Sequence, residues 1–171
     1  GVVDQLIAGY ITKARLHAHE ADYQGALNTL KDADKPVVLF GFDRLRLHIV
    51  AERIRLYLLI GEDKLAFEEG RKNGLSGPPY HLKPDENSCV DTCILAIARA
   101  RLALKKNDEF GAVRLLKQWW EYLSEKGAWS LAISVAVRMA VTMAEKDDRC
   151  SARRYIVDAL SVFYARYFVR C

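Results

Sequence analysis

Long hydrophobic stretches and a dense set of cysteines are both missing from this sequence. No apolar run reaches the roughly 20 residues that cross a bilayer, and the first residues lack a basic region followed by an apolar core. The four cysteines, Cys89, Cys93, Cys150 and Cys171, are too sparse for a disulfide framework. These absences predict a cytoplasmic protein with no membrane partner.

Motifs of catalysis and of cofactor binding are also missing. The chain contains no phosphate-binding glycine loop, no zinc signature and no nucleophile motif. Cys89 and Cys93 lie one helical turn apart, but two thiolates without a nearby pair of ligands fall short of a tetrahedral metal site, so we interpret them as small buried hydrophobic residues. His17 and His19 point to different sides of a helix. We expect no enzyme activity, no metal and no cofactor in this segment.

Proline is scarce, and three of the four prolines fall within residues 74–87. This stretch is the only long loop that we expect, and it has two interpretations. It is either a connector that wraps one edge of the fold, or a lid or contact loop with a function. The remaining proline, Pro36, is expected to end a helix near Ala33, because proline removes a backbone donor and restricts the residue before it.

What the sequence does contain is a repeat. The segments 14–30, 54–70, 100–116 and 140–156 align without a gap. Each has an alanine at the same place, and an acidic residue four positions before that alanine. The alanines are Ala26, Ala66, Ala112 and Ala152, and the acidic residues are Asp22, Glu62, Asp108 and Asp148. The alanines recur at intervals of 40, 46 and 40 residues, which is typical of stacked helical hairpins.

Each copy of the repeat predicts a helix, a tight turn and a second helix. Apolar residues recur at helical spacing before the turn, and the acidic residue is placed to cap the following helix. A hairpin of this kind cannot bury both of its faces alone, so neighbouring hairpins must stack. We therefore predict an all-α fold, a right-handed superhelix of about four tetratricopeptide-like hairpins. The expected hairpins span about residues 3–34, 42–74, 88–125 and 129–167.

The repeat also predicts a binding surface, because the leading helices of such stacks line their concave side. Arginine occupies the same repeat position at Arg15, Arg55 and Arg101, where the last copy has Val141. This column could hold an anionic ligand through bidentate hydrogen bonds, or each arginine could pair with an acidic side chain of a neighbouring repeat. The candidate ligand-binding residues on this concave wall are Arg15, Arg55, Arg101, His48, Ile94 and Ile97.

The charge and the two ends of the chain bear on the class of protein. A net charge of +4, with acidic residues such as Glu52 among the arginines, does not indicate nucleic-acid binding within this segment. The chain begins inside an expected helix and ends just after residues 160–170, a run too apolar to cap a stack. We expect a single-domain fragment of a longer protein. Its C-terminal helix would contact the rest of that protein or a second copy.

A short pattern of residues resembles a known family. Ala14-Arg15-Leu16 with Ala26-Leu27, and Ala100-Arg101-Leu102 with Ala112 and Leu115-Leu116, are similar to the helical-repeat region of large bacterial transcription activators of the MalT type, within the LuxR family. Ile54-Arg55-Leu56 with Ala66 matches in part, and the fourth copy departs from the pattern at Val141. Ala159-Leu160 followed by Tyr167-Phe168-Val169-Arg170 is similar to the segment that leads toward the DNA-binding domain of that family.

The resemblance implies a sensing role. In such regulators an ATPase module precedes the repeats and a helix-turn-helix follows them, while the repeats receive the inducer. We therefore expect a signal-sensing domain that binds a small inducer or a regulatory protein on its concave face, with ATP and DNA bound elsewhere in the parent chain. The alternative is a general protein-interaction scaffold whose groove takes a partner's peptide or helix.

Overall fold

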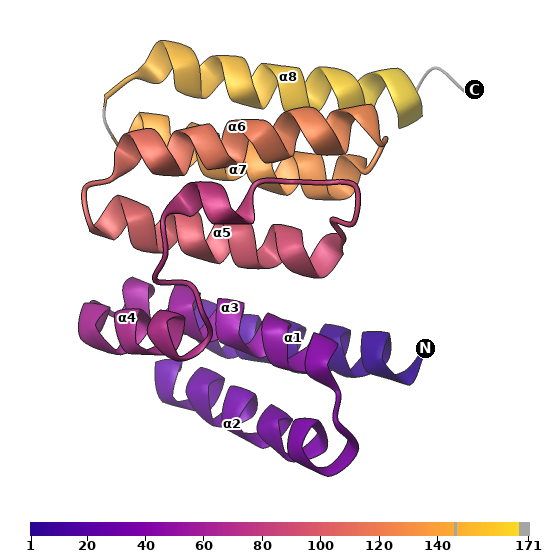
Figure 1. Ribbon diagram of the computed structural model, residues 1–171, viewed down its shortest axis with the longest axis vertical. Helices are drawn as coiled ribbons and strands as arrows, with labels where there is room; N and C mark the ends of the chain where they lie inside the picture. Colours follow the sequence, from indigo (N-terminus) through magenta and orange to yellow (C-terminus); the bar gives the residue numbers. More distant parts are fainter. Residues whose placement is uncertain (146, 168–171) are drawn as a thin grey trace.

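The structure, a computed structural model, describes residues 1–145 and 147–167. These residues form eight α-helices and one short 3-10 helix, and contain no strand (Figure 1). The elements are α1 (Val2–His19), α2 (Tyr23–Phe40), α3 (Asp43–Leu59), α4 (Asp63–Lys72), η1 (Pro79–Leu82), α5 (Val90–Lys105), α6 (Glu109–Glu125), α7 (Trp129–Ala144) and α8 (Arg149–Tyr167). About 80% of the chain is helical, so the prediction of an all-α protein is confirmed.

The packing is local along the chain. Each α-helix packs against the next one, and in addition α1 contacts α3, α3 contacts α5 and α5 contacts α7. The buried apolar residues form three separate clusters, within α1 to α3, within α3 to α5 and within α5 to α7. The structure therefore buries its apolar surface between neighbouring elements and has no single central core, as expected when hairpins cover one another.

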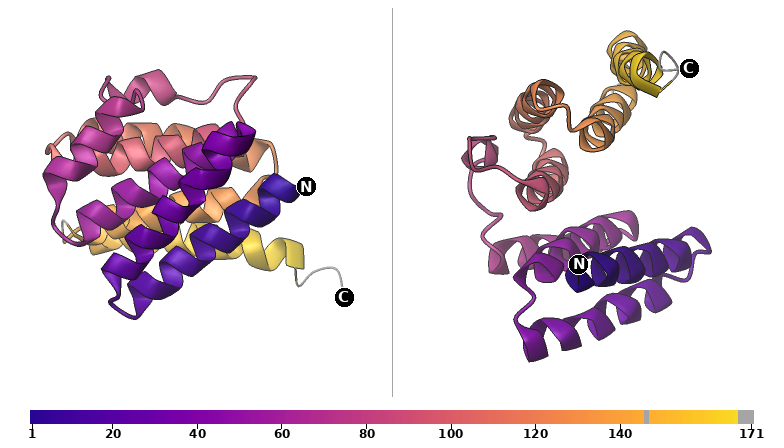
Figure 2. Two further views of the ribbon diagram at one scale, coloured as in Figure 1. Left: turned by 90° about the horizontal axis from the view of Figure 1, so that it is seen from below. Right: turned by 90° about the vertical axis from the view of Figure 1, so that its right-hand side faces the viewer.

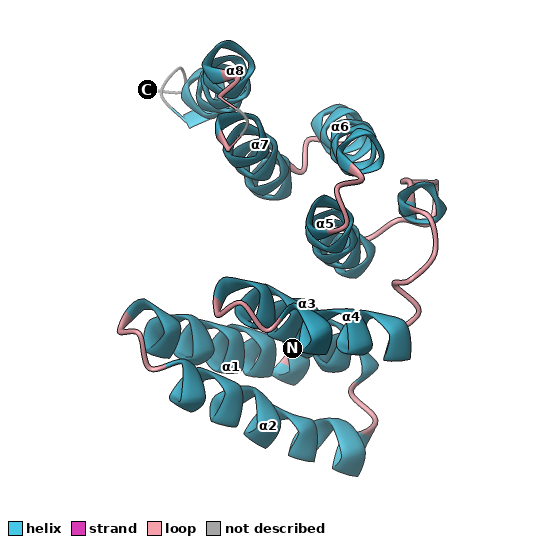
Figure 3. Cartoon of the chain, turned by 90° about the vertical axis from the view of Figure 1, so that its left-hand side faces the viewer, coloured by secondary structure: helices cyan, strands magenta, loops and turns pink. Residues whose placement is uncertain are grey.

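The two halves of the chain differ in direction. In the right-hand view of Figure 2 and in Figure 3, α5 to α8 are seen end-on while α1 to α4 run across the view, so the two sets of helices lie at a clear angle. The change falls where the repeat interval lengthens to 46 residues. Here α4 has only 10 residues and residues 74–87 follow it. The irregular junction thus separates two regular pairs of hairpins.

The four tight turns within the hairpins share one backbone conformation. The residue directly before each aligned acidic residue has a positive φ: Ala21 at 60°, Gly61 at 80°, Asn107 at 60° and Asp147 at 62°. Only glycine adopts this left-handed conformation without a steric cost, and only the second hairpin has glycine there. The shared turn explains why the four segments align without a gap.

Three of the four aligned acidic residues cap the following helix as predicted. A carboxylate oxygen accepts a hydrogen bond from a backbone N–H three residues on, in Asp22 from Gly25, in Asp108 from Gly111 and in Asp148 from Ser151, at 2.8 to 3.0 Å. The Ser151 hydrogen bond lowers the pKa of Asp148, because it stabilises the charged carboxylate. Glu62 makes no such bond, and its longer side chain is a poorer fit to the cap position.

The aligned alanines occupy similar environments in the first three hairpins. Ala26, Ala66 and Ala112 are fully buried, whereas Ala152 is half-buried in α8. Among the described residues, α8 packs only on α7, so this last helix lacks the cover that the other alanines have.

The helix end predicted at Pro36 is wrong. α2 continues through Pro36 to Phe40 and ends at Gly41, whose left-handed backbone (φ 67°) lets its N–H donate to the Val37 carbonyl at 3.0 Å. Ala33 is fully buried, and Val37 packs against the cluster within α1 to α3. Burial of this face offsets the hydrogen bond that proline removes, so tertiary packing overrides the local breaker.

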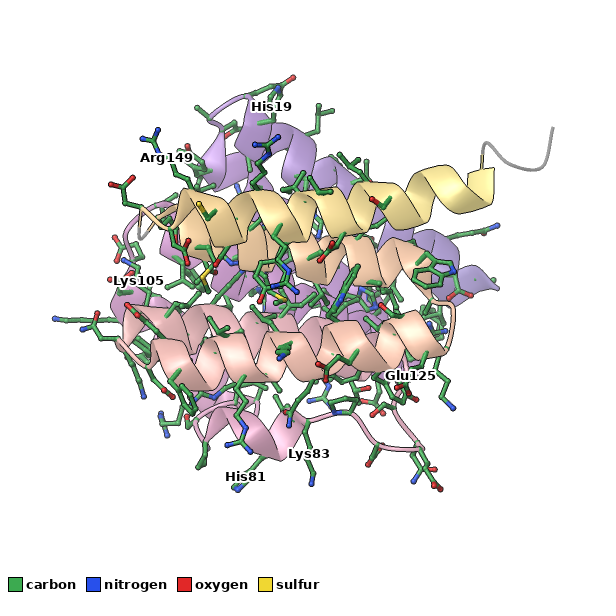
Figure 4. The ribbon with its side chains drawn as sticks, turned by 90° about the horizontal axis from the view of Figure 1, so that it is seen from above. His19, His81, Lys83, Lys105, Glu125 and Arg149 are labelled. Atoms are coloured by element: carbon green, nitrogen blue, oxygen red, sulfur yellow. The ribbon has the colours of Figure 1, made fainter. Side chains whose placement is uncertain are left out.

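The long loop at residues 74–87 is tied down on the outer side of the fold. The Gly77 carbonyl accepts a hydrogen bond from Arg99 Nε, and the Leu82 carbonyl accepts one from Trp119 Nε1, both at 2.7 Å. Trp119 is buried, and its ring meets Tyr122 edge-on. In Figure 4, His81 and Lys83 of the loop lie at the edge opposite to His19. These contacts favour the connector interpretation of the loop.

The cysteine prediction holds for one residue of the pair. Cys93 is fully buried, and burial raises the pKa of its thiol to about 12, but Cys89 is exposed because it directly precedes α5. No group of three or more His, Cys, Asp or Glu side chains within the described part of the chain could hold a metal ion.

The C-terminal helix carries exposed apolar side chains. Ile156, Val157 and Leu160 are between 37% and 51% exposed. The predicted apolar run continues to residue 170, and residues 168–171 lie outside the described part of the chain. None of the described helices combines the length and the apolar character that would let it cross a membrane.

Candidate functional site

A groove of about 990 Å³ runs along the leading helices of the four hairpins. Its walls come from α1, α3, α5 and α7, so side chains from both halves of the chain face the same space. The six residues singled out from the sequence all line it: Arg15, His48, Arg55, Ile94, Ile97 and Arg101. The structure thus brings the candidate residues together, while ligand binding by them stays a prediction.

Two of the three aligned arginines pair inside the protein. Glu52 is 3% exposed and lies between them. Arg15 donates to Glu52 Oε2 from Nε at 3.2 Å and from Nη2 at 3.1 Å, and Arg55 Nε donates to Oε1 at 2.7 Å. Both carboxylate oxygens are therefore occupied. Arg15 therefore pairs with an acidic residue of the neighbouring repeat, as one interpretation expected, whereas Arg55 pairs with a residue of its own helix, three positions before it.

Arg101 differs from its two repeat equivalents. Among the described residues it has no hydrogen bond and no ion pair, and its side chain is half-buried. Burial, with a smaller effect of Arg138 in the same direction and Glu52 opposing, lowers the pKa of Arg101 to about 10. The guanidinium remains charged at neutral pH, because this pKa still lies far above 7. Arg101 therefore places a desolvated positive charge in the groove, with no hydrogen-bond partner among the described residues.

A second hollow of about 440 Å³ continues from the groove. Arg55, Leu59 and Arg101 line both spaces, so the two are contiguous. The second hollow adds Arg138 from α7 and Lys105 from the end of α5. The Arg138 Nε is buried and has no hydrogen-bond partner among the described residues.

A network of polar side chains near the starts of α3 and α5 pairs its charged groups with one another. His48 lies with Nε2 at 3.0 Å from Asp91 Oδ1, and Arg44 Nε donates to Asp91 Oδ2 at 3.0 Å. Arg44 also donates to Asp4 at 3.0 Å, which links α1, α3 and α5. Asp91 raises the pKa of Arg44 above its usual value, and Asp4 adds to this effect. His48 is thus held by a carboxylate, as expected for a residue that stabilises the wall.

Much of the remaining wall is apolar, although Thr12, His19, Tyr23 and Ser134 also line it. Ile94 and Ile97 of α5 are half-buried, and they face the groove together with Ala51, Leu59 and Val137. An apolar surface with a few placed polar groups is typical of sites for small organic molecules. The residues along the groove form no arrangement of a nucleophile with a general base.

Two residues of the site were missed by the sequence reasoning. Arg138 and Glu52 share one repeat position, three residues before that of the arginine column, and residues three apart lie on the same helix face. Reading the neighbouring turn of each leading helix would have placed both in the groove. The pairing of Glu52 with Arg15 could not have been read in this way, because it depends on side-chain directions across helices.

The comparisons add no relative to this picture. No protein-family model matches the chain, and neither the search of curated proteins nor that of solved structures finds a match. The resemblance to MalT-type activators therefore rests on the residues quoted for it above.

Proposed function

We propose that this segment is the signal-sensing region of a larger bacterial transcription regulator of the MalT-like, LuxR-family type. In this proposal the four hairpins form a right-handed superhelix whose concave groove receives a small inducer or a regulatory protein. ATP and DNA are bound by other parts of the same regulator, which acts in the cytoplasm. Ligand binding shifts the regulator toward its active state only if the ligand binds that state more tightly.

The single observation that carries the proposal is the groove itself. One continuous space of about 990 Å³ is shared by α1, α3, α5 and α7, which belong to all four hairpins. Cavities of about 300 to 1,000 Å³ are usual for small-molecule sites. A ligand seated there would contact both halves of the chain at once. In this proposal the ligand changes the angle between the halves and so passes a signal along the chain.

A protein-interaction scaffold is the second candidate. The hollow that continues from the groove adds about 440 Å³, and together the two exceed the space that one small molecule usually fills. A partner's amphipathic helix could lie along such a channel with its apolar face on Ile94 and Ile97. In that case small molecules would bind only weakly, and a peptide would be the natural ligand.

The ligand-sensing proposal can be tested by blocking the groove. Ser134 is exposed, lies on α7 and lines the groove, so Ser134→Trp should fill the space without disturbing a core. A metabolite that raises the unfolding temperature of the unaltered protein should no longer do so in this variant. The matched control is Lys117→Trp, which places the same bulk at an exposed position on α6 away from the groove.

Two results would contradict the proposal. Equal stabilisation of both tryptophan variants by the metabolite would place its site outside the groove. The coding sequence around this segment gives the other check, because a regulator of this type requires an upstream phosphate-binding loop and a downstream helix-turn-helix. The absence of both would exclude this class of parent protein.

A further inference from the structure

We propose that the groove recognises the oxyanion of its ligand through Arg101 and Arg138, so that the ligand is a small molecule with a carboxylate or phosphate group on an apolar body. This inference rests on the proposed function, since it names the chemistry of the ligand in the same groove. The proposal assigns the anion site to Arg101, which belongs to the arginine column, and to Arg138, which lies outside that column.

The geometry selects these two arginines by elimination within the described residues. Arg15 and Arg55 are already bound to Glu52, and their donors are directed to its two oxygens. Arg101 has no hydrogen bond of its own. Arg138 has a buried Nε without a partner, and its contact with Glu145 is 3.7 Å, longer than a hydrogen bond.

The balance of charge around the second hollow also favours an anion. The described side chains that line it bring four cations and one carboxylate, namely Arg55, Arg101, Lys105 and Arg138 against Glu145. Arg55 shares the carboxylate of Glu52 with Arg15, and Lys105 Nζ is paired with Asp63 at 3.1 Å. Glu145 faces Arg138 but is 62% exposed, so solvent weakens its effect. One desolvated positive charge is left without a counterpart.

The surroundings define the rest of the ligand. Leu58, Leu59 and Leu104 line the hollow beside the two arginines, and Ile94 and Ile97 line the adjoining groove. An oxyanion held between guanidinium groups would therefore continue into an apolar channel. Guanidinium binds carboxylate and phosphate through paired, charge-assisted hydrogen bonds, and both oxyanions fit this description. A ligand with charge at both ends would lose solvation along the isoleucines without compensation.

The test follows the arginine and isoleucine side chains by nuclear magnetic resonance. The probes are octanoate, octyl phosphate and octan-1-ol, which share one apolar chain and differ in the head group. Both anions should shift the Nε–Hε signals of Arg101 and Arg138 together with the methyl signals of Ile94 and Ile97. The neutral alcohol should bind about tenfold more weakly or worse, because it lacks the charged hydrogen bonds. The ratio of the two anion affinities identifies the preferred head group.

Variants separate the contribution of each group. Arg101→Gln should weaken octanoate binding by about tenfold or more, while Arg101→Lys, which keeps the charge but loses the paired geometry, should recover part of it. Arg114→Gln is the matched control, since it removes the same charge from an exposed position on α6. It should leave the affinity unchanged. Far-ultraviolet circular dichroism of each variant checks that the helices are retained.

The outcomes distinguish the two proposals. If the alcohol shifts the isoleucine methyl signals as strongly as the anions do and the arginine signals stay still, the anion site is excluded while the groove remains a ligand site. If Arg114→Gln weakens octanoate binding as much as Arg101→Gln does, the effect is one of net charge, and the proposed site is excluded. If no probe moves either set of signals, both proposals fail.

Discussion

Each half of the chain contributes two arginines to the groove and the adjoining hollow, and the two halves differ in the partners of these arginines. Arg15 and Arg55, from α1 and α3, bind the buried carboxylate of Glu52. Arg101 and Arg138, from α5 and α7, have no comparable carboxylate. Repeat position alone therefore does not fix the role of a residue. In the first half Glu52 binds Arg15 across two helices and Arg55 within its own helix, whereas in the second half Arg101 has no hydrogen bond among the described residues.

The difference arises at one repeat position. The residue three before the arginine column is Glu52 in the second hairpin, Ala98 in the third and Arg138 in the fourth. A carboxylate there is shared by the two nearest arginines and offsets one of their two positive charges, while an arginine at the same place adds a positive charge near Arg101. The side chain at this one position of each hairpin thus determines whether the nearby arginines have a carboxylate partner or face a further positive charge.

The largest effect on stability is expected at Glu52, whose buried carboxylate binds Arg15 of α1 and Arg55 of α3. Glu52→Gln should lower the free energy of unfolding by about 2 to 3 kcal/mol, because it leaves two arginines facing each other without their shared counter-charge. Urea unfolding followed by circular dichroism measures this change. The control is Glu68→Gln, an exposed acidic residue on α4, which should change stability by less than about 0.5 kcal/mol. Equal effects of the two changes would contradict the comparison.

A smaller effect on stability is expected at the arginine column, and its sign should differ between the two halves. Arg55→Met should destabilise the fold by about 1 to 2 kcal/mol, since it leaves the buried Glu52 with only one partner. Arg101→Met keeps the apolar stem and removes a desolvated charge that has no partner, so stability should stay the same or rise by up to about 1 kcal/mol. Urea unfolding of the two variants side by side tests this. A loss of stability in Arg101→Met as large as that in Arg55→Met would show that Arg101 is a structural residue like its equivalents.

The smallest effect concerns the turns, where the hairpins of both halves are alike. Ala21 and Gly61 adopt the same left-handed backbone. Ala21→Gly should raise the free energy of unfolding by up to about 1 kcal/mol, and Gly61→Ala should lower it by about the same amount, because only glycine avoids the steric cost. A β-carbon added at Gly61 would meet no atom within 4 Å, so no clash confuses the result. Changes of the same sign in the thermal unfolding of the two variants would contradict the shared turn.

The hairpins and their caps were predictable because their causes are local. The helical spacing of apolar residues, the acidic cap and the left-handed stop after α4 all act within a few residues. At that stop Gly74 has φ 75°, and the Leu75 N–H donates to the Gly70 carbonyl at 2.7 Å. The wall of the groove was predictable as well, because residues at the same repeat position lie on the same side of successive hairpins.

Other features could not be predicted because packing decides them. Pro36 lies inside α2, where burial of Ala33 outweighs the missing hydrogen bond. Cys89 was expected to be buried, yet it is exposed at the start of α5, a boundary that the apolar pattern places only to within a few residues.

By itself the sequence determined the all-α class and indicated which side chains lie along one wall, because these depend on periodicity and on interactions between near neighbours. Only the tertiary structure decided which arginines bind a buried carboxylate. The bond from Arg15 to Glu52 depends on a few ångströms between side chains of different helices, and Arg101, at the same repeat position as Arg15, has no such bond among the described residues.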